Sequence, residues 1–288
     1  MFDRNETLAS ARERNVRDAL SEDIGRQDWT ALLVPDDQRV RARVLVREEA
    51  VLCGREWFDA CFAAVDNEVT IDWHCAEGER MAANTLVCHI EGRARALLSA
   101  ERPGLNFLQL LSGTATTTRR HVDAIAGASP NPKGCAILDT RKTLPGLRQA
   151  QKYAVRVGGG HNQRMALWHG ILIKENHIAS AGGIPQVLAA AEALHAGVDI
   201  QIEVEGLAQL AQAIEHGARN VMLDNFDLAG MREAVALNAG RAVLEVSGGV
   251  NMDTVRDIAS TGVDRISIGA LTKDVRATDY SMRVLERI

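Results

Sequence analysis

Apolar and polar positions in the first third of the chain follow the short periods of a small mixed unit. Stretches with apolar residues at helical spacing alternate with stretches in which every second residue is apolar, and turn-rich segments separate them. The pattern predicts helices over 6–20 and 56–65 and strands over 40–44, 69–73 and 85–90. These elements predict a compact α+β unit with few residues that suggest catalysis or ligand binding.

The helical pattern that runs from residue 96 to residue 125 contains a break at Pro103 and Gly104. A helix that starts near Pro103 would leave Arg102 at its amino-terminal mouth, because proline is favoured at the first helical position. On this pattern alone, a ligand-binding role for Arg102 and a solvated arginine at a helix end are equally supported.

Beyond Gly134, short β-rich runs alternate with helical stretches such as 207–214 and 253–259. Alternation of this kind predicts parallel strands joined by right-handed helical crossovers. The six runs cover 136–138, 171–173, 200–202, 220–223, 242–244 and 265–268. This part of the chain is therefore predicted to be an α/β barrel.

Polar or glycine residues follow every one of the six runs. They stand at the carboxyl ends of the predicted strands, where α/β barrels keep their active sites. The residues at these ends are Asp139, Thr140, Arg141, Lys142, Lys174, Glu175, Asn176, His177, Glu203, Glu205, Asp224, Asn225, Ser247, Gly248, Gly249, Gly269 and Ala270. Because the coincidence recurs at every strand, we predict a functional site at this mouth of the barrel.

The segment 133–174 is strongly basic, although the chain as a whole has a net charge of −5. It holds eight basic residues and a single acid, Asp139, for a local charge of +7. A positive field of that size in an acidic protein suggests an anionic ligand, although most charge runs are solvated faces. Here the bases are interleaved with glycines and with two apolar runs that end in polar residues, which favours a site. The glycines 158–160 within it could cradle an anion or form a flexible turn ahead of His161, and no Walker sequence follows them.

The predicted mouth contains two kinds of charged group. Its bases, which suit carboxylates and phosphates, are Arg141, Lys142, Arg164 and Lys174. Its acids, Glu203 and Asp224, suit Mg²⁺, the waters of that ion or sugar hydroxyls. The alternative is a set of internal salt bridges, in which Glu203 or Asp224 neutralises Lys174.

Small residues dominate the two loops after the last strands, Ser247-Gly248-Gly249 and Gly269-Ala270. Glycine lets backbone N–H groups approach a phosphate, and the amino terminus of the next helix adds its dipole. No nucleophile elbow, zinc-protease motif or activated cysteine motif is present. Catalysis by positioning and electrostatics is therefore favoured over a covalent intermediate.

Composition and cysteine usage exclude several other classes. The acidic balance argues against a nucleic-acid binder, the first thirty residues are too charged for a signal peptide, and no apolar run reaches membrane-spanning length. Five cysteines without a C-x-x-C motif fit reduced thiols in a cytoplasmic protein. The adjacent pairs His74-Cys75 and Cys88-His89 are not expected to bind zinc, because neighbouring side chains in a strand point to opposite faces.

Eight segments, in order and spacing, resemble the quinolinate phosphoribosyltransferase family. They are ERPGLNFLQLLSG, LDTRKTLPGLR, QKYAVRVGGG, LIKENHI, IEVEG, VMLDNF, EVSGGV and ISIGALT. The resemblance extends from about residue 19 to residue 283, and LDTRKTLPGLR and LIKENHI are its most specific parts.

The resemblance implies a fold and an assembly. It implies an N-terminal α/β sandwich domain over 1–115, an open α/β (TIM-like) barrel over 116–273, and a C-terminal tail, 274–288, that packs back on the first domain. It also implies a homodimer or an assembly of dimers, in which Arg102 reaches the quinolinate pocket of the neighbouring subunit.

The resemblance further implies a decarboxylating pentosyl transfer. Quinolinate and phosphoribosyl pyrophosphate would react, with Mg²⁺, to nicotinate mononucleotide, pyrophosphate and CO2 in NAD biosynthesis. Arg141, Arg164 and Lys174 would hold the quinolinate carboxylates, beside Thr140. The residues implied as catalytic are Lys142, between quinolinate and pyrophosphate, and Glu203 and Asp224, which would bind ribose hydroxyls and the metal directly or through water or substrate. The residues implied to seat the 5′-phosphate are Ser247, Gly248, Gly249, Gly269 and Ala270.

One departure from the family pattern concerns the segment before the second barrel strand. Family members often read G-G-G-x-N-H-R there, whereas this chain has Gln163 at the histidine position and His161 two positions earlier. Glutamine can donate a hydrogen bond but cannot carry charge, so no imidazole role is transferred to either residue. Two other functions stay open: a phosphoribosyltransferase for nicotinate or a pyrimidine-like acid, and a phosphosugar-binding barrel without catalysis.

Overall fold

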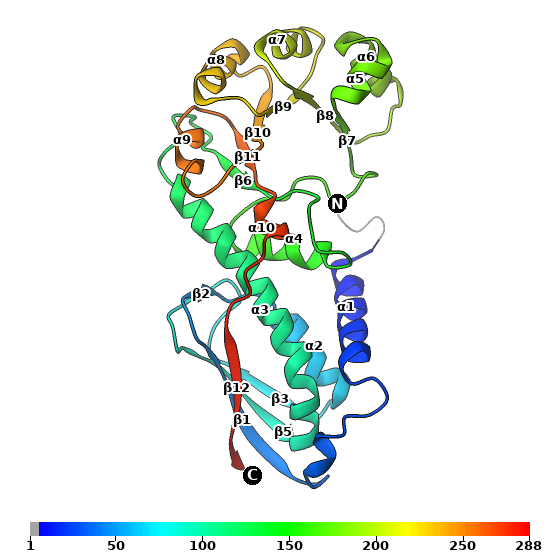
Figure 1. The fold of residues 1–288 in the computed structure, drawn as a ribbon, viewed down its shortest axis with the longest axis vertical. Coiled ribbons are helices and arrows are strands. Elements are labelled where there is room, and N and C mark those ends of the chain that lie inside the picture. The colour runs from blue at the N-terminus through cyan, green and yellow to red at the C-terminus, as the bar shows by residue number, and fades with distance from the viewer. Residues whose placement is uncertain (1–5) are drawn as a thin grey trace. The chain divides into compact units, whose positions relative to one another are not determined.

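Strand β1 (Arg39–Val46) is the centre of an antiparallel sheet in the computed structural model, which describes residues 6–288 (Figure 1). Its alternating side chains leave one face of the strand buried and the other polar. β1 pairs with β5 (Leu86–Arg93) on one side and β12 (Tyr280–Arg287) on the other, and β5 pairs with β3 (Thr70–Trp73). The sheet order is therefore β12-β1-β5-β3.

The chain divides into two units. The first takes the chain up to Arg119, Thr143–Gly159 and Thr272–Ile288, and the second takes Arg120–Lys142 and Gly160–Leu271. Beside the sheet, the elements of the first unit are α1 (Leu8–Asp23), η1 (Ala31–Leu33), β2 (Ala50–Val51), α2 (Arg55–Val65), β4 (Arg80–Met81), most of α3 (Ala94–Ile125) and α4 (Arg148–Val157). No helix within residues 6–288 has both the length and the apolar character that a membrane crossing requires.

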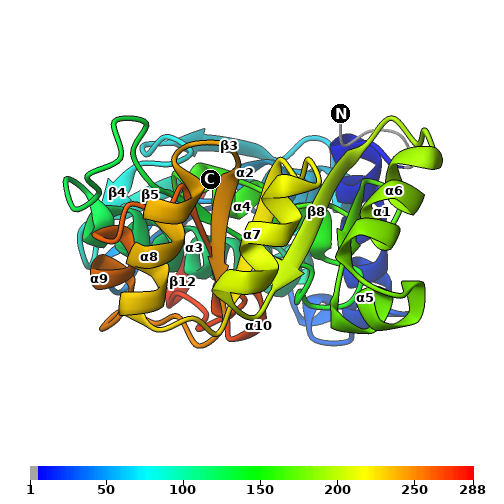
Figure 2. The same ribbon diagram turned by 90° about the horizontal axis from the view of Figure 1, so that it is seen from above.

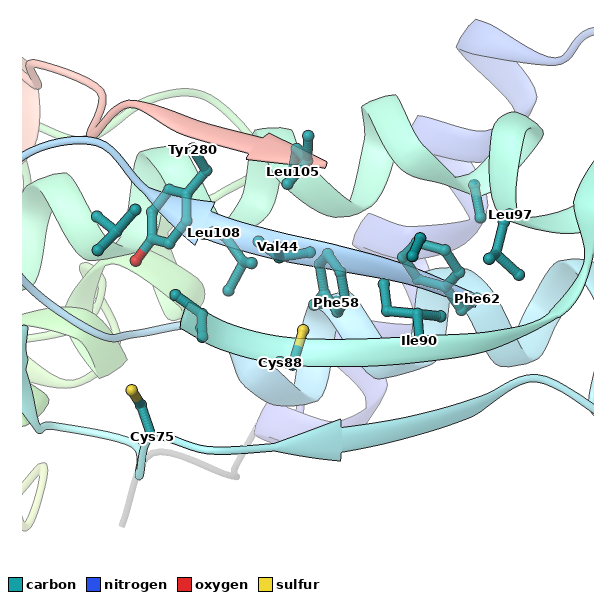
Figure 3. Packing of buried hydrophobic residues seen from close by; sticks show 14 of the residues in the cluster. Val44, Phe58, Phe62, Cys75, Cys88, Ile90, Leu97, Leu105, Leu108 and Tyr280 are labelled. Atoms are coloured by element: carbon teal, nitrogen blue, oxygen red, sulfur yellow. The ribbon is translucent and has the colours of Figure 1, made fainter. Parts of the chain in front are cut away.

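The core of the first unit lies between the sheet and the helices α2 and α3 (Figure 3). Val44 and Ile90 from the sheet pack with Phe58 from α2 and Leu108 from α3, and all four are fully buried. Burying one such side chain stabilises the fold by about 1.5–3 kcal/mol relative to leaving it exposed. This packing fixes which face of each strand points outward.

Helix α3 is one continuous helix, so the prediction that a helix starts near Pro103 is wrong. A proline inside a helix costs roughly 3 kcal/mol, because it removes one hydrogen bond and crowds the preceding turn. Leu97 and Leu105, on either side of it, are buried, and a Cβ on Gly104 would lie 3.0 Å from Phe62. The free energy gained by burying these side chains outweighs the local cost of the proline. Arg102 therefore lies within the helix rather than at the amino terminus of one.

The second unit is built on six parallel strands, as the sequence pattern predicts. They are β6 (Ala136–Leu138), β7 (Gly170–Ile173), β8 (Asp199–Val204), β9 (Asn220–Asp224), β10 (Val243–Ser247) and β11 (Arg265–Ser267). Their helices are α5 (Glu175–Ala181), α6 (Ile184–Ala193), α7 (Leu207–Glu215), α8 (Leu228–Asn238), α9 (Val255–Ala259) and α10 (Ala270–Lys273, counted with the first unit from Thr272). Helices α5 to α8 form a layer over β7, β8 and β9, which Figure 2 views from above.

The strand order β6-β11-β10-β9-β8-β7 is that of an α/β barrel opened between its first two strands. β6 and β7 follow each other in sequence but stand at opposite ends of the order. On its free side, β6 meets the loop segment at His161 through a parallel bridge to Leu138. The predicted fold class, a small sheet domain followed by a parallel α/β domain, is confirmed.

One segment falls on the other side of the predicted domain boundaries. Residues 143–159, which the sequence analysis places in the barrel, belong to the first unit, where Gln151 donates to the backbone oxygen of Thr272 at 2.7 Å. The C-terminal residues supply β12, the edge strand beside β1. The first unit is thus assembled from three separate stretches of the chain.

Candidate active site

Lys174 and Glu203 form an ion pair at the carboxyl ends of β7 and β8. The two strands pair in parallel with Ile173 opposite Ile202, so the next residues are neighbours. The Nζ atom of Lys174 lies 2.8 Å from Oε2 of Glu203, and the side chains are 45 % and 10 % exposed. The internal salt bridge considered from the sequence is therefore present, and it holds the ammonium group at the mouth of the barrel.

The backbone at Lys174 is fixed by the helix that begins directly after it. Lys174 is the N-cap of α5, and its N–H donates to Nδ1 of His177 at 3.0 Å. Both residues belong to the LIKENHI segment, so one hydrogen bond joins the middle of this motif to its end. His177 thereby positions the backbone of Lys174, a role that the sequence analysis does not assign to it.

Thr140 shapes the turn after β6. Its Oγ1 accepts the backbone N–H of Lys142 at 3.0 Å, a local side-chain turn that presents the residues Arg141 and Lys142 after the strand. A Cβ on Gly269 would lie 3.0 Å from Cδ of Lys142, so the lysine stem passes over the loop after β11. The structure thereby brings together the first and last polar loops of the predicted mouth.

Asp224 and Ser247 are direct neighbours at the ends of β9 and β10. Oδ2 of Asp224 accepts a hydrogen bond from Nδ2 of Asn225 at 3.0 Å. Asn225 has a φ of 55°, and a Cβ on Gly248 would lie 2.4 Å from its Oδ1. With its own φ of 100°, position 248 therefore requires glycine, both for its conformation and for its close approach to Asn225.

The two small-residue loops differ in how soon a helix begins after them. Helix α10 begins at Ala270, directly after Gly269, but α9 does not begin until Val255, well after Gly249. The predicted helix amino terminus next to the loop after β10 is therefore absent from the described chain. Backbone N–H groups in glycine conformation, with φ of 100° and 62° at Gly248 and Gly249, are available in that loop to bind an anion.

Asp139, the one acid in the basic segment, is fully buried and bound within the protein. Its carboxylate accepts Nδ2 of Asn162 at 2.5 Å and the backbone N–H of Gln163 at 2.9 Å. These bonds tie the segment around His161 to the end of β6. Asp139 therefore serves the packing of this segment and is not exposed at the mouth.

Arg164 lies beside the start of β7, whereas Lys174 follows its end. Its Nη1 donates to the backbone oxygen of Gly170 at 2.9 Å, and its side chain lines a cavity of about 120 Å³ with Arg265 and Asp199. Burial, and then the nearby charge of Arg141, lower the pKa of the Arg164 guanidinium. Two cations held this close would be stabilised by an anion that contacts both.

Gln163, at the position where the family often has histidine, belongs to a buried chain of hydrogen bonds. Its Nε2 donates to Oε1 of Gln201 at 2.7 Å, and Nε2 of Gln201 donates to Oε2 of Glu245 at 3.0 Å. Glu245 is 1 % exposed, and burial raises its pKa. The sequence analysis missed Gln201 and Glu245. Their only signal is a polar residue at an inward position of a short barrel strand.

His161 contributes to this region through its backbone. Its N–H donates to the oxygen of Ile137 at 2.8 Å, and its own oxygen accepts the N–H of Asp139 at 3.2 Å.

Arg102 lies on an exposed position of α3 in the first unit, next to Glu101. Its charge partly offsets the rise that burial causes in the pKa of Glu101.

Comparison with known proteins decides the family. The model of the quinolinate phosphoribosyl transferase C-terminal domain matches residues 114–283, and that of the N-terminal domain matches residues 28–112. The chain belongs to the quinolinate phosphoribosyltransferase family. The two matched ranges meet inside α3, which is continuous across them.

Named relatives of this quinolinate phosphoribosyltransferase family member match it over most of their length. It is 38% identical over 264 residues to the probable nicotinate-nucleotide pyrophosphorylase (carboxylating) of Bacillus subtilis, covering 91% of this chain and 90% of that protein. It is 35% identical over 287 residues to a mitochondrial quinolinate phosphoribosyltransferase (decarboxylating) of Nicotiana tabacum, covering 92% and 80%. The solved nicotinate-nucleotide pyrophosphorylase of Francisella tularensis superposes with a TM-score of 0.92 at 42% identity over 98% of each chain.

Proposed function

We propose that this protein transfers the phosphoribosyl group of phosphoribosyl pyrophosphate to quinolinate and removes one carboxylate, in NAD biosynthesis. The products are nicotinate mononucleotide, pyrophosphate and CO2. The observation that carries the proposal is the pairing of Lys174 with Glu203 at the mouth of a barrel whose basic loops also hold Arg141 and Lys142. The family match over both domains supports it, since these residues fall in the motifs LDTRKTLPGLR and LIKENHI.

In this proposal, Arg141 and Lys174 at the mouth bind the diacid, and the guanidinium of Arg164, beside the start of β7, joins them. Quinolinate carries two adjacent carboxylates, and Arg141, Arg164 and Lys174 supply three positive charges for them. Arg164 lies near enough to Arg141 for its pKa to be lowered. Three positive charges exceed what a single carboxylate needs, which favours the diacid over a monoacid such as nicotinate.

The glycine loops and the two acids bind the phosphoribosyl half of the reaction. Backbone N–H groups at Gly248 and Gly249 face the 5′-phosphate, and Glu203 and Asp224 bind the ribose hydroxyls. Lys142, whose stem crosses Gly269, lies between the diacid and the pyrophosphate. The arrangement holds two highly charged anions in reacting positions, and such positioning is the largest contribution the chain itself makes.

The chemistry then requires orientation and charge stabilisation. As the bond from the anomeric carbon to pyrophosphate breaks, the ribose becomes oxocarbenium-like and the pyridine nitrogen bonds to that carbon. The pyridinium so formed accepts the electron pair left at C2 when the 2-carboxylate departs as CO2, and a proton then adds at C2. Lys142 stabilises the charge on the departing pyrophosphate, and the carboxylates of Glu203 and Asp224 stabilise the positive charge on the ribose.

Mg²⁺ fits the acids of this mouth. Glu203 and Asp224 offer carboxylate oxygens at the ends of neighbouring strands β8 and β9, and carboxylate oxygens are the ligands that Mg²⁺ prefers. We propose that one or both of these carboxylates would hold the ion, directly or through water. When bound, it supplies Lewis-acid stabilisation of the leaving group.

The test is release of CO2 from quinolinate labelled in the 2-carboxylate, measured with phosphoribosyl pyrophosphate and Mg²⁺. We expect one CO2 for each nicotinate mononucleotide formed. Product formed from nicotinate but not from quinolinate would contradict the proposal and favour a nicotinate phosphoribosyltransferase. Binding of phosphoribosyl pyrophosphate without turnover of either acid would favour a barrel that binds phosphosugars only.

A further inference from the structure

Two histidines and an aspartate meet on the outer face of the sheet in the first unit. Asp72 lies on β3 and His74 follows the end of that strand, two residues further on. Residues two apart in a strand share a face. His89 on β5 is the direct partner of Asp72 in the antiparallel register, so all three side chains emerge side by side.

The three possible ligand atoms lie within coordination reach of one another. Nε2 of His74 is 2.9 Å from Nδ1 of His89 and 4.0 Å from Oδ2 of Asp72. All three ligand atoms fall within 4.8 Å of one another. Two imidazole nitrogens bound to one Zn²⁺ at about 2.0–2.1 Å in tetrahedral geometry are roughly 3.3 Å apart, so only a small adjustment is needed.

The ring orientations also suit a shared ion. The two imidazoles are nearly perpendicular, at 86°, with centroids 5.0 Å apart. One nitrogen of each ring points at the other, and an N–H···N hydrogen bond joins them in the metal-free protein. Replacing that shared proton by a cation keeps both nitrogens satisfied.

We propose that Asp72, His74 and His89 form a binding site for a divalent transition-metal ion, with Zn²⁺ as the reference ion. Two imidazoles and one carboxylate are a ligand set suited to Zn²⁺, Ni²⁺ or Co²⁺ and poorly suited to Mg²⁺. The side chains of His74 and Asp72 are 36% and 79% exposed, so the ion is reached from solvent and keeps water in its remaining positions. The site lies in the first unit and is separate from the acids of the barrel mouth.

The strands hold the ligands in place before metal arrives. The N–H of His74 donates to the backbone oxygen of Val87 at 2.9 Å, which extends the pairing of β3 and β5 past Trp73. The adjacent cysteines, Cys75 and Cys88, are buried in the core on the other side of the sheet (Figure 3). Ligands on paired strands lose little freedom on binding, which favours affinity.

One neighbouring charge opposes the cation. Arg43 on β1 is the direct partner of His89, whereas the nearby Glu91 is bound to Arg41. The carboxylate of Asp72 offsets the charge of Arg43 in part. We therefore expect weaker binding than in closed sites with four protein ligands.

The test is titration of the full-length, metal-stripped protein with Zn²⁺ against a chromophoric chelator, with Mg²⁺ in excess. We expect one equivalent of Zn²⁺ to bind, and His74→Gln and His89→Gln each to weaken it by at least ~10-fold. Asp72→Asn is expected to weaken it in the same direction. His216→Gln is the matched control, since His216 is exposed and its Nδ1 lies 2.8 Å from the backbone oxygen of Gln212 in its own helix.

A second measurement locates the ion independently of affinity. Co²⁺ in place of Zn²⁺ should give visible ligand-field bands that disappear in His74→Gln and persist in Glu203→Gln. Unchanged Zn²⁺ affinity in all three variants at 72, 74 and 89 would overturn the proposal. Bands that disappear only in Glu203→Gln would overturn it as well and assign the ion to the barrel mouth. Melting of each metal-free variant checks that the sheet is intact.

Discussion

The ammonium of Lys174 and the carboxylate of Glu203 lie 2.8 Å apart because β7 and β8 end side by side in parallel register. One residue belongs to the diacid half of the proposed site and the other to the phosphoribosyl half. Each side chain therefore fixes the position of the other. Substrate binding must either break this ion pair or leave it in place.

Replacement of Glu203 by glutamine tests the acid side of that pair. We expect kcat to fall by about 10²–10³-fold, because one group aimed at developing charge is lost, while the protein melts within a few degrees of the wild type. Glu205→Gln, two residues further along and exposed, is the matched control and should retain activity. Full activity in Glu203→Gln would remove Glu203 from the catalytic residues.

Arg141→Ala tests the carboxylate assignment. We expect quinolinate to bind on the order of 100-fold more weakly, since a charge-assisted bidentate contact is lost, with little change in the melting temperature. Isothermal titration with quinolinate measures this. Arg156→Ala, which removes an exposed charge of the same basic segment, should change the affinity little. Equal losses in the two variants would mean that only the general positive field matters.

Gly248→Ala tests the loop after β10. The added Cβ would lie 2.4 Å from Oδ1 of Asn225 at a φ of 100°, so we expect a loss of about 1–3 kcal/mol in stability and a higher KM for phosphoribosyl pyrophosphate. Gly249→Ala is the control, because its φ is 62° but no atom lies within 4 Å of the added Cβ. Denaturant unfolding and initial rates measure both effects, and an equal cost at 248 and 249 would argue against the contact with Asn225.

Glu245 gives the protein a pH-dependent stability. Burial raises its pKa in the folded state, so the folded protein binds this proton more tightly than the unfolded chain does. The stabilisation from this tighter proton binding is fully present at pH values below the pKa of Glu245 in the unfolded chain. It is lost as the pH rises through the pKa of Glu245 in the folded protein. We therefore expect Glu245→Gln to raise the melting temperature at pH 8 relative to the wild type and to have a smaller effect at pH 5. Glu233→Gln, at an exposed position, should show no such difference.

Arg102 tests whether sites are shared between subunits. We propose that Arg102 completes the quinolinate pocket of a partner, as its exposed position on α3 permits. Mixing inactive Arg102→Ala with inactive Lys174→Ala subunits should restore about one quarter of the wild-type activity if dimers exchange freely. Subunit exchange demonstrated by mass or fluorescence without recovered activity would contradict a shared site.

Local periodicity was sufficient to predict the six barrel strands and the residues at their ends, because strand, turn and helix signals are short-range. It was not sufficient for α3, where burial around Pro103 outweighs the local preference for a break. It also could not place 143–159 in the first unit, because that assignment depends on contacts far apart in sequence, such as Gln151 with Thr272.

The residues of the site can be predicted from the sequence, but their ion-pair and hydrogen-bond partners cannot. The pairing of Lys174 with Glu203 results from strand register, and the sequence left it as one of two alternatives. The chain from Gln163 through Gln201 to Glu245 joins a loop and two barrel strands and has no local signal. The alternation of side chains along a strand correctly places His74 and Cys75 on opposite faces of the sheet. Only the register of β3 against β5 reveals that His74 lies beside His89.

The position of β12 imposes an order on the folding of this protein as it is synthesised. β12 (Tyr280–Arg287) covers one side of β1, yet the ribosome makes it after all six barrel strands. Until those residues emerge, β1 presents an open row of backbone donors and acceptors to any other nascent chain. The sheet that begins the sequence is thus completed last, and the edge of β1 is open to non-native pairing during that interval.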